Sequence, residues 1–127
     1  MVFDIADPFC TLILKGVQIA LGPTGMLPII MDATNQGKQF ERCLAVMLER
    51  RVEGLIVVAN WLLADKYIAG NLEAFGVPVV IVGREVKSAI VSSVLVDNEV
   101  GGYLALQHLH QMGHRRIAVM LPKGASR

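Results

Sequence analysis

The sequence predicts an α/β fold, a parallel-sheet, Rossmann-like three-layer sandwich. Short apolar runs alternate along the chain with segments of helical periodicity, and the links between them are short. This alternation is typical of right-handed βαβ units. Hydrophobic residues make up 54% of the 127 residues and charged residues 18%, a composition that suits a sheet buried on both faces and excludes a disordered chain.

Five apolar runs are expected to form strands, because each is short and is bounded by polar or turn-forming residues. They are residues 1–5, 26–31, 55–59, 79–82 and 90–96.

The first expected helix begins at Pro8, with Asp7 as its N-cap, and ends before Gly22. Its expected inward stripe is Phe9, Ile13, Val17 and Ala20. A second helix follows the polar loop at residues 32–37, and a third spans residues 65–75 and stops at Gly76. Two apolar stripes are expected to face the core, Phe40, Cys43, Leu44, Met47 and Leu48 in the second helix and Ile68, Leu72 and Phe75 in the third.

Several function classes lack support in the sequence. A net charge of +1 gives no electrostatic basis for nucleic-acid binding by this segment. Cys10 and Cys43 lack metal-ligand spacing and are expected to be reduced thiols, and the histidines have no metal-like partners. No signal peptide or membrane-spanning run is found, so we expect a protein of the cytoplasm with no membrane contact.

Catalytic patterns are also missing. The glycines at residues 22–25 follow a helix rather than a strand, which excludes a dinucleotide fingerprint there, and no GxSxG elbow is present. We therefore expect a binding module that is not an enzyme and needs no cofactor or metal.

Ligands of parallel α/β sheets bind at the carboxyl ends of the strands. The loops at those ends are residues 4–9, 32–35, 60–61, 83–84 and 97–98. They carry carboxylates, amides, one guanidinium and aromatic rings, which suit sugar hydroxyls, base edges and flat ring faces.

Structural roles compete with ligand binding at these positions. Asp7 fits a helix cap as well as a ligand contact, and Asp32 and Asn35 fit a turn. Trp61 fits surface packing, and Arg84 fits an ion pair with Glu85 or Asp97.

Four segments resemble the bacterial LacI/GalR family of transcription regulators. FDIADPF at residues 3–9 resembles the loop after the family's first strand, and LERRVEGLIVVA at residues 48–59 resembles its second helix and third strand. GVPVVIVGR at residues 76–84 is similar to the family's GIPVV strand. The most specific match is DNEVGGYLALQHLHQMGHRRIAV at residues 97–119.

The resemblance implies a periplasmic-binding-protein-like (type I) architecture. Residues 1–96 would form the N-terminal lobe of an effector-binding domain, and residues 97–127 the crossover and the start of a truncated C-terminal lobe. Family members bind a sugar, sugar phosphate or purine between the lobes. They thereby control operator binding by a separate helix-turn-helix headpiece. We expect no such headpiece in this chain, so DNA would be bound only through a headpiece absent from it. The implied ligand contacts on this lobe are Asp7, Phe9, Trp61, Gly83, Arg84 and Asp97. A lobe of a periplasmic-type sugar-binding protein is the alternative.

Two residues depart from the family pattern. Asp7 replaces the usual Asn and adds a charge that disfavours an anionic ligand unless Arg84 compensates. Gly83 stands where many members have an Asp that holds the ligand. The identity of the effector therefore stays open.

Residues 99–112 and 117–121 are expected to be the first helix and strand of the second lobe. Exposure of their apolar side chains would forfeit about 7–15 kcal/mol, as much as the stability of a typical domain. We therefore expect residues 99–121 to pack onto the first lobe or to be exchanged with another copy, giving a homodimer or an exchanged oligomer.

Overall fold

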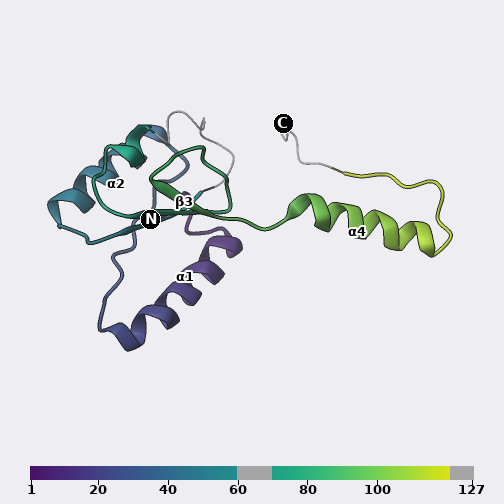
Figure 1. The fold of residues 1–127 in the computed structure, drawn as a ribbon, viewed down its shortest axis with the longest axis horizontal. Helices are drawn as coiled ribbons and strands as arrows, with labels where there is room; N and C mark the ends of the chain where they lie inside the picture. Colours follow the sequence, from purple (N-terminus) through teal and green to yellow (C-terminus); the bar gives the residue numbers. More distant parts are fainter. Residues whose placement is uncertain (60–69, 121–127) are drawn as a thin grey trace. The chain divides into compact units, whose positions relative to one another are not determined.

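The computed structural model describes residues 1–59 and 70–120. The chain forms two compact units, Met1–Leu95 and Val96–Arg127, which are described separately. Figure 1 shows their elements along the chain.

A parallel sheet lies at the centre of the first unit. Strands β1 (Leu55–Val58), β2 (Val79–Val82) and β3 (Val91–Val94) pair in that order. Val2 forms parallel bridges to Val58 on one side and to Asp32 on the other. The N-terminal segment therefore lies between β1 and the chain at Asp32, and the sheet order continues beyond β1.

Strands were correctly predicted at β1, β2 and β3, although β3 is shorter than expected. The predicted strands at residues 1–5 and 26–31 are wrong, because the first is reduced to the bridges of Val2 and the second forms none, since the bridge partner of Val2 is Asp32, just after that run. The first ends early because the Asp4 side chain accepts a hydrogen bond from the Ala6 N–H at 2.9 Å and starts a turn. The second has no covered face to hold it, since its Leu27 side chain is 90% exposed.

Helices cover both faces of the sheet, with α1 (Pro8–Leu21) on one side and α2 (Gly37–Glu49) on the other, as Figure 1 shows. Successive strand residues point to opposite faces. Phe3 and Val57 pack in the larger core with α2, whereas Val2 and Val58 pack in the smaller core with Cys10 of α1. The predicted three-layer arrangement of helix, sheet and helix is therefore present.

The predicted bounds of α1 are confirmed, and a short 3-10 helix, η1 (Gly22–Thr24), follows it. Its predicted stripe is confirmed at Ile13, which packs against the smaller core, but is wrong at Phe9 and Ala20, which are exposed, and it omits the buried Cys10. Ile13 and Val17 are half-buried. The helix thus turns its Cys10 side to the sheet.

The α2 stripe is confirmed at Phe40, Cys43, Leu44 and Met47, all of which are buried. Leu48 is the exception, since its side chain is 49% exposed. For α2, the helical spacing of apolar residues is therefore enough to predict which side chains face the core.

Only residues 70–73 of the third predicted helix are described as helical, and Ile68 lies outside the described residues. Leu72 and Phe75 are buried as expected. Gly76 has a φ of 76°, the left-handed conformation that fits its predicted role as the stop.

Helix α4 (Asn98–Gln111) is the main element of the second unit, and Asp97 caps it by accepting a hydrogen bond from the Val100 N–H at 2.9 Å. No residue of α4 is buried. The predicted strand at 117–121 is wrong for residues 117–120, which have no regular structure. The expected burial of the apolar side chains in this unit stays a prediction about the assembled protein.

Candidate functional site

The loop after the N-terminal segment is fixed by two aspartates. Asp4 uses Oδ1 to accept the Ala6 N–H at 2.9 Å, and Asp7 uses Oδ1 to accept the Phe9 N–H at 2.9 Å. The second bond makes Asp7 the N-cap of α1, as predicted. The loop is therefore ordered by its own side chains at the carboxyl end of the sheet.

The loop at residues 32–35 is tied to this first loop. Asp32 Oδ1 accepts the Thr34 N–H at 2.8 Å, and Thr34 and Asn35 have φ angles of 49° and 54°. This left-handed turn brings the Asn35 N–H to within 2.7 Å of the Phe3 carbonyl oxygen, and its Nδ2 donates to Asp4 Oδ2 at 3.5 Å. The turn roles of Asp32 and Asn35 are thus present, and they join two loops of the candidate site.

Gly83 and Phe9 meet at the end of β2. Gly83 has a φ of 91°, and a Cβ added there would lie 3.0 Å from the Ala59 carbonyl oxygen and 3.4 Å from Phe9 Cε1. The position therefore requires glycine for its conformation and for the close approach of the β1 backbone. The Phe9 ring lies against this turn and is 45% exposed, so part of its surface is open to a ligand.

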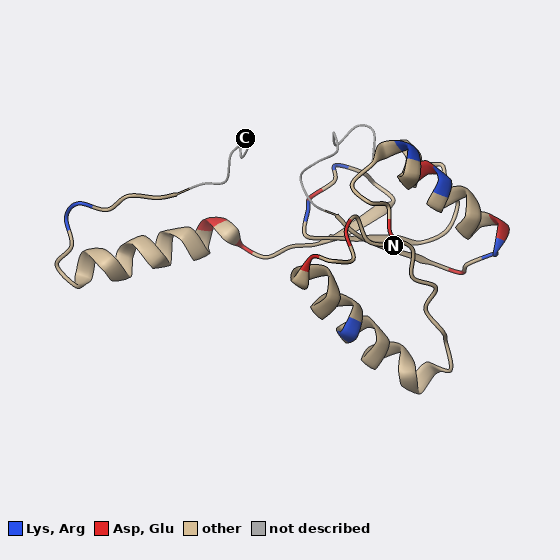
Figure 2. Cartoon of the chain, turned by 180° about the vertical axis from the view of Figure 1, so that it is seen from behind, with Lys and Arg blue, Asp and Glu red and all other residues tan. Residues whose placement is uncertain are grey.

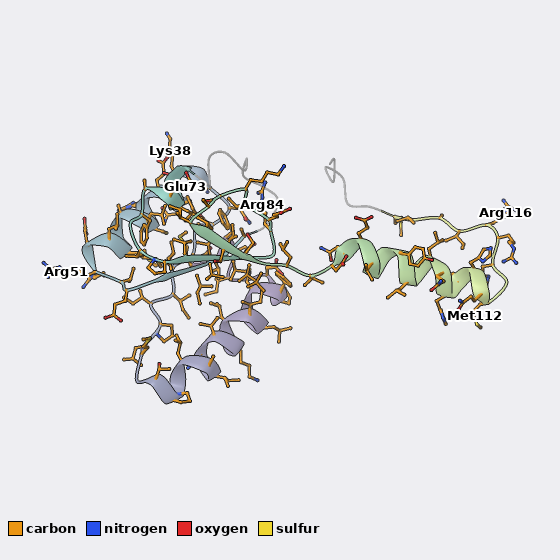
Figure 3. All side chains as sticks on the ribbon, viewed as in Figure 1. Lys38, Arg51, Glu73, Arg84, Met112 and Arg116 are labelled. Atoms are coloured by element: carbon orange, nitrogen blue, oxygen red, sulfur yellow. The ribbon has the colours of Figure 1, made fainter. Side chains whose placement is uncertain are left out.

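Arg84 follows Gly83 directly and is half-buried. The Gly83 N–H donates to the Val94 carbonyl oxygen at 2.9 Å, which joins this turn to β3. Figure 3 shows Arg84 and Arg51 at opposite ends of the first unit, in keeping with their positions after β2 and before β1. Arg84 already takes part in an interaction within the chain.

The predicted site residues thus fall into three groups. Phe9 and Gly83 are in contact, and Asp7 and Arg84 adjoin them in the chain. Asp97 caps α4 in the second unit, and Trp61 lies outside the described residues. Asp4 was not singled out from the sequence, although a carboxylate directly after an apolar run is a recognisable pattern.

The carboxylates give the site its electrostatic character. Burial raises the pKa of the Cys10 thiol, and the charges of Asp7, Asp4 and Asp32 raise it further. These three carboxylates therefore lie in one neighbourhood around Cys10. Figure 2 shows the acidic colour at the start of α1.

A hollow of about 540 Å³ lies at the other end of the sheet, and we call it the amino-end groove. It is largely apolar, and its lining includes Leu14, Leu21, Leu27, Ile56 and Val80. Its charged lining residues are Arg50, Arg51 and Glu53.

Two kinds of feature are absent from the part of the chain that the structure describes. No group of three or more His, Cys, Asp or Glu side chains there is placed to hold a metal ion. No helix among these residues is long and apolar enough to cross a membrane.

Comparison with known proteins places this geometry in context. The model of periplasmic binding proteins and the sugar-binding domain of the LacI family matches residues 1–126. The repressor CytR of Escherichia coli is 25% identical over 115 residues, which are 90% of this chain and 33% of CytR. The chain thus spans about a third of the length of this curated relative.

Solved structures show the same fold. A LacI family regulator from Lactobacillus casei with bound sucrose superposes with a TM-score of 0.73 and 23% identity, over 91% of this chain and 41% of that chain. The Cra regulator from Pseudomonas putida in complex with fructose 1-phosphate gives a TM-score of 0.71 and 21% identity, over 87% of this chain and 40% of that chain. The parallel sheet between two helical layers is therefore the periplasmic-binding-protein-like fold.

Proposed function

The chain belongs to the family of periplasmic binding proteins and sugar-binding domains of LacI-type regulators, and from this membership we propose that it senses a small-molecule effector for a transcriptional regulator. The effector would be a sugar or a related metabolite. Its binding would control the operator affinity of a helix-turn-helix headpiece in the longer regulator, which would act in the cytoplasm.

One observation carries this proposal. The half-exposed Phe9 ring lies against the Gly83 turn at the carboxyl end of β2, next to the loop that the Asp4 and Asp7 carboxylates order. An aromatic face beside hydrogen-bonding groups is the combination that sugar rings use, because their C–H faces stack while their hydroxyls bond.

The proposal also assigns parts of the chain to the two lobes and names the residues that contact the effector. Residues 1–96 would be the N-terminal lobe, and residues 97–127 the crossover and the first part of the C-terminal lobe. Asp7, Phe9, Trp61, Gly83, Arg84 and Asp97 would contact the effector. The exposed apolar side chains of α4 support a homodimer or an exchanged oligomer, in which they would be covered. The function would be binding without catalysis, as in the regulators that the chain resembles.

The test is a thermal-shift screen of the chain against uncharged sugars, sugar phosphates and purines, at millimolar ligand because one lobe supplies only part of a cleft. A stabilising ligand is expected, since binding to the native state alone raises its stability. Phe9→Ala should abolish the shift. Leu12→Ala is the matched control, because Leu12 is an exposed apolar residue of the same helix. A failure of every ligand to stabilise the chain, or an equal loss in both variants, contradicts the proposal.

A further inference from the structure

We propose that the carboxyl-end site selects an uncharged or cationic effector and discriminates against an anionic one, such as a sugar phosphate. This inference rests on the proposed function and names the ligand class of the same site. The selecting residues are Asp4, Asp7 and Asp32.

The start of α1 is closed to an anion. A helix N-terminus attracts anions through its unpaired N–H groups and its dipole. Here the Asp7 carboxylate takes that place, since its Oδ1 accepts the Phe9 N–H at 2.9 Å. A phosphate approaching this helix would meet a carboxylate.

Asp4 and Asp32 add to the same negative field. Each is oriented by a backbone N–H of its own loop, from Ala6 at 2.9 Å and from Thr34 at 2.8 Å. The two loops are tied together, because Asn35 Nδ2 donates to Asp4 Oδ2 at 3.5 Å. The three carboxylates therefore lie on linked loops at the carboxyl end of the sheet.

The hydrogen-bonding groups of the site also favour a ligand that donates hydrogen bonds over a phosphate. An ionised carboxylate only accepts hydrogen bonds, and so does a fully ionised phosphate group. A sugar hydroxyl or an ammonium group donates, and therefore pairs with an Asp oxygen. Acceptors facing acceptors would leave a phosphate without partners on this side of the site.

Two of the described cations, Lys38 and Arg51, lie away from Arg84 (Figure 3). Lys38 lies in the first turn of α2, and its side chain extends away from the first unit, as Figure 3 shows. Arg51 and Arg84 lie at opposite ends of that unit (Figure 3). Arg84 adjoins the site but already takes part in an interaction within the chain.

The experiment measures the affinity of the full chain for matched ligand pairs by NMR titration. The pairs are fructose with fructose 1-phosphate and glucose with glucose 6-phosphate, and glucosamine is the cationic probe. The uncharged member of a pair should bind at least about tenfold more tightly than its phosphate, because three carboxylates repel the added charge. Glucosamine should bind at least as well as glucose.

Variants assign the effect to the site. Asp7→Asn keeps a helix cap, since asparagine caps as well as aspartate. It should reduce several-fold the ratio of the affinity for the uncharged ligand to that for its phosphate. Asp32→Asn should reduce this ratio as well, through a different loop. Glu53→Gln removes the same charge at an exposed residue before β1 and should leave the preference unchanged.

Each outcome decides a different claim. Tighter binding of the phosphate member overturns the inference and leaves the proposed function standing. An equal change in Glu53→Gln and Asp7→Asn also overturns it, because net charge rather than the site would then be responsible. A chain that binds none of these ligands contradicts the proposed function itself.

Discussion

The two faces of the sheet in the first unit differ in how well they are covered. On the α2 face, Phe3 stacks on Phe40 with ring centroids 5.2 Å apart, within a large buried cluster. On the α1 face, Val2, Cys10 and Val58 are the buried residues, and Leu12 and Ile19 of α1 are exposed. The α2 face therefore supplies most of the first unit's stability, whereas the α1 face leaves its helix start and loops available for a ligand.

The largest expected effect is on the well-covered face. Phe40→Ala should lower the free energy of unfolding by about 3–5 kcal/mol, because the fully buried ring leaves a cavity under Phe3. Urea unfolding measures the change. Leu12→Ala, on the outer side of α1, should stay within about 0.5 kcal/mol. Similar losses in the two variants would erase the contrast between the faces.

The N-terminal amino group lies in the sheet between these faces. It donates to the Ile56 carbonyl oxygen at 2.7 Å, and burial lowers its pKa from 8.0 to about 6. The unfolded chain therefore binds this proton more readily than the folded chain. Stability is lost as the pH falls from about 8 to about 6, by about 2–3 kcal/mol, and this group adds no further loss below that range.

Urea unfolding at several pH values between 6 and 8 measures this slope. The matched control is the same chain with an acetylated N-terminus, which keeps an N–H donor but has no charge to lose. An identical slope in the acetylated chain would assign the pH dependence to other groups.

A smaller loss is expected at the carboxyl end. Gly83→Ala should destabilise the lobe by about 2 kcal/mol, because alanine disfavours a φ of 91° and its Cβ would approach the Ala59 carbonyl oxygen at 3.0 Å. The variant should also weaken ligand binding, since the same Cβ approaches the Phe9 ring. Gly25 has a φ of 74° and open space around it, so Gly25→Ala measures the cost of the backbone conformation without a close contact. Equal losses at the two glycines would leave no role for the close contact.

The smallest expected difference is between two neighbouring valines of β1 that face opposite sides of the sheet. Val57 and Val58 are 0% and 1% exposed but face α2 and α1, respectively. Val57→Ala should cost about 2 kcal/mol and Val58→Ala about 1 kcal/mol, because the thinner layer can relax into the space. Thermal or urea unfolding of both variants provides the test. A larger loss at Val58 would mean that the α1 face is the tighter one.

The sequence predicts the well-covered face better than the other. The α2 stripe and the buried strands follow from periodicity, because both sides of each contact carry apolar residues. The predicted strand at residues 26–31 and the predicted burial of Phe9 and Ala20 in α1 are wrong, since an apolar run does not reveal whether another layer covers it. Leu48 illustrates the same limit at the end of α2.

At the candidate site, the rule on strand ends selects the loops that carry Phe9 and Gly83, and the structure places these two residues in contact. The link from Asn35 to Asp4 was not predicted, because it depends on consecutive left-handed residues at Thr34 and Asn35. The reason for glycine at Gly83 is likewise a distance to a neighbouring strand, which no local pattern contains.

The central claim is that the carboxyl end of the sheet, and not the amino-end groove, binds the effector. The most direct measurement is a map of backbone amide shifts as sucrose, glucose or fructose is added to the labelled chain. We expect the shifts to cluster at Asp4, Phe9, Asn35 and Gly83. Shifts that cluster instead at the lining of the amino-end groove, around Leu27 and Gly54, would contradict it.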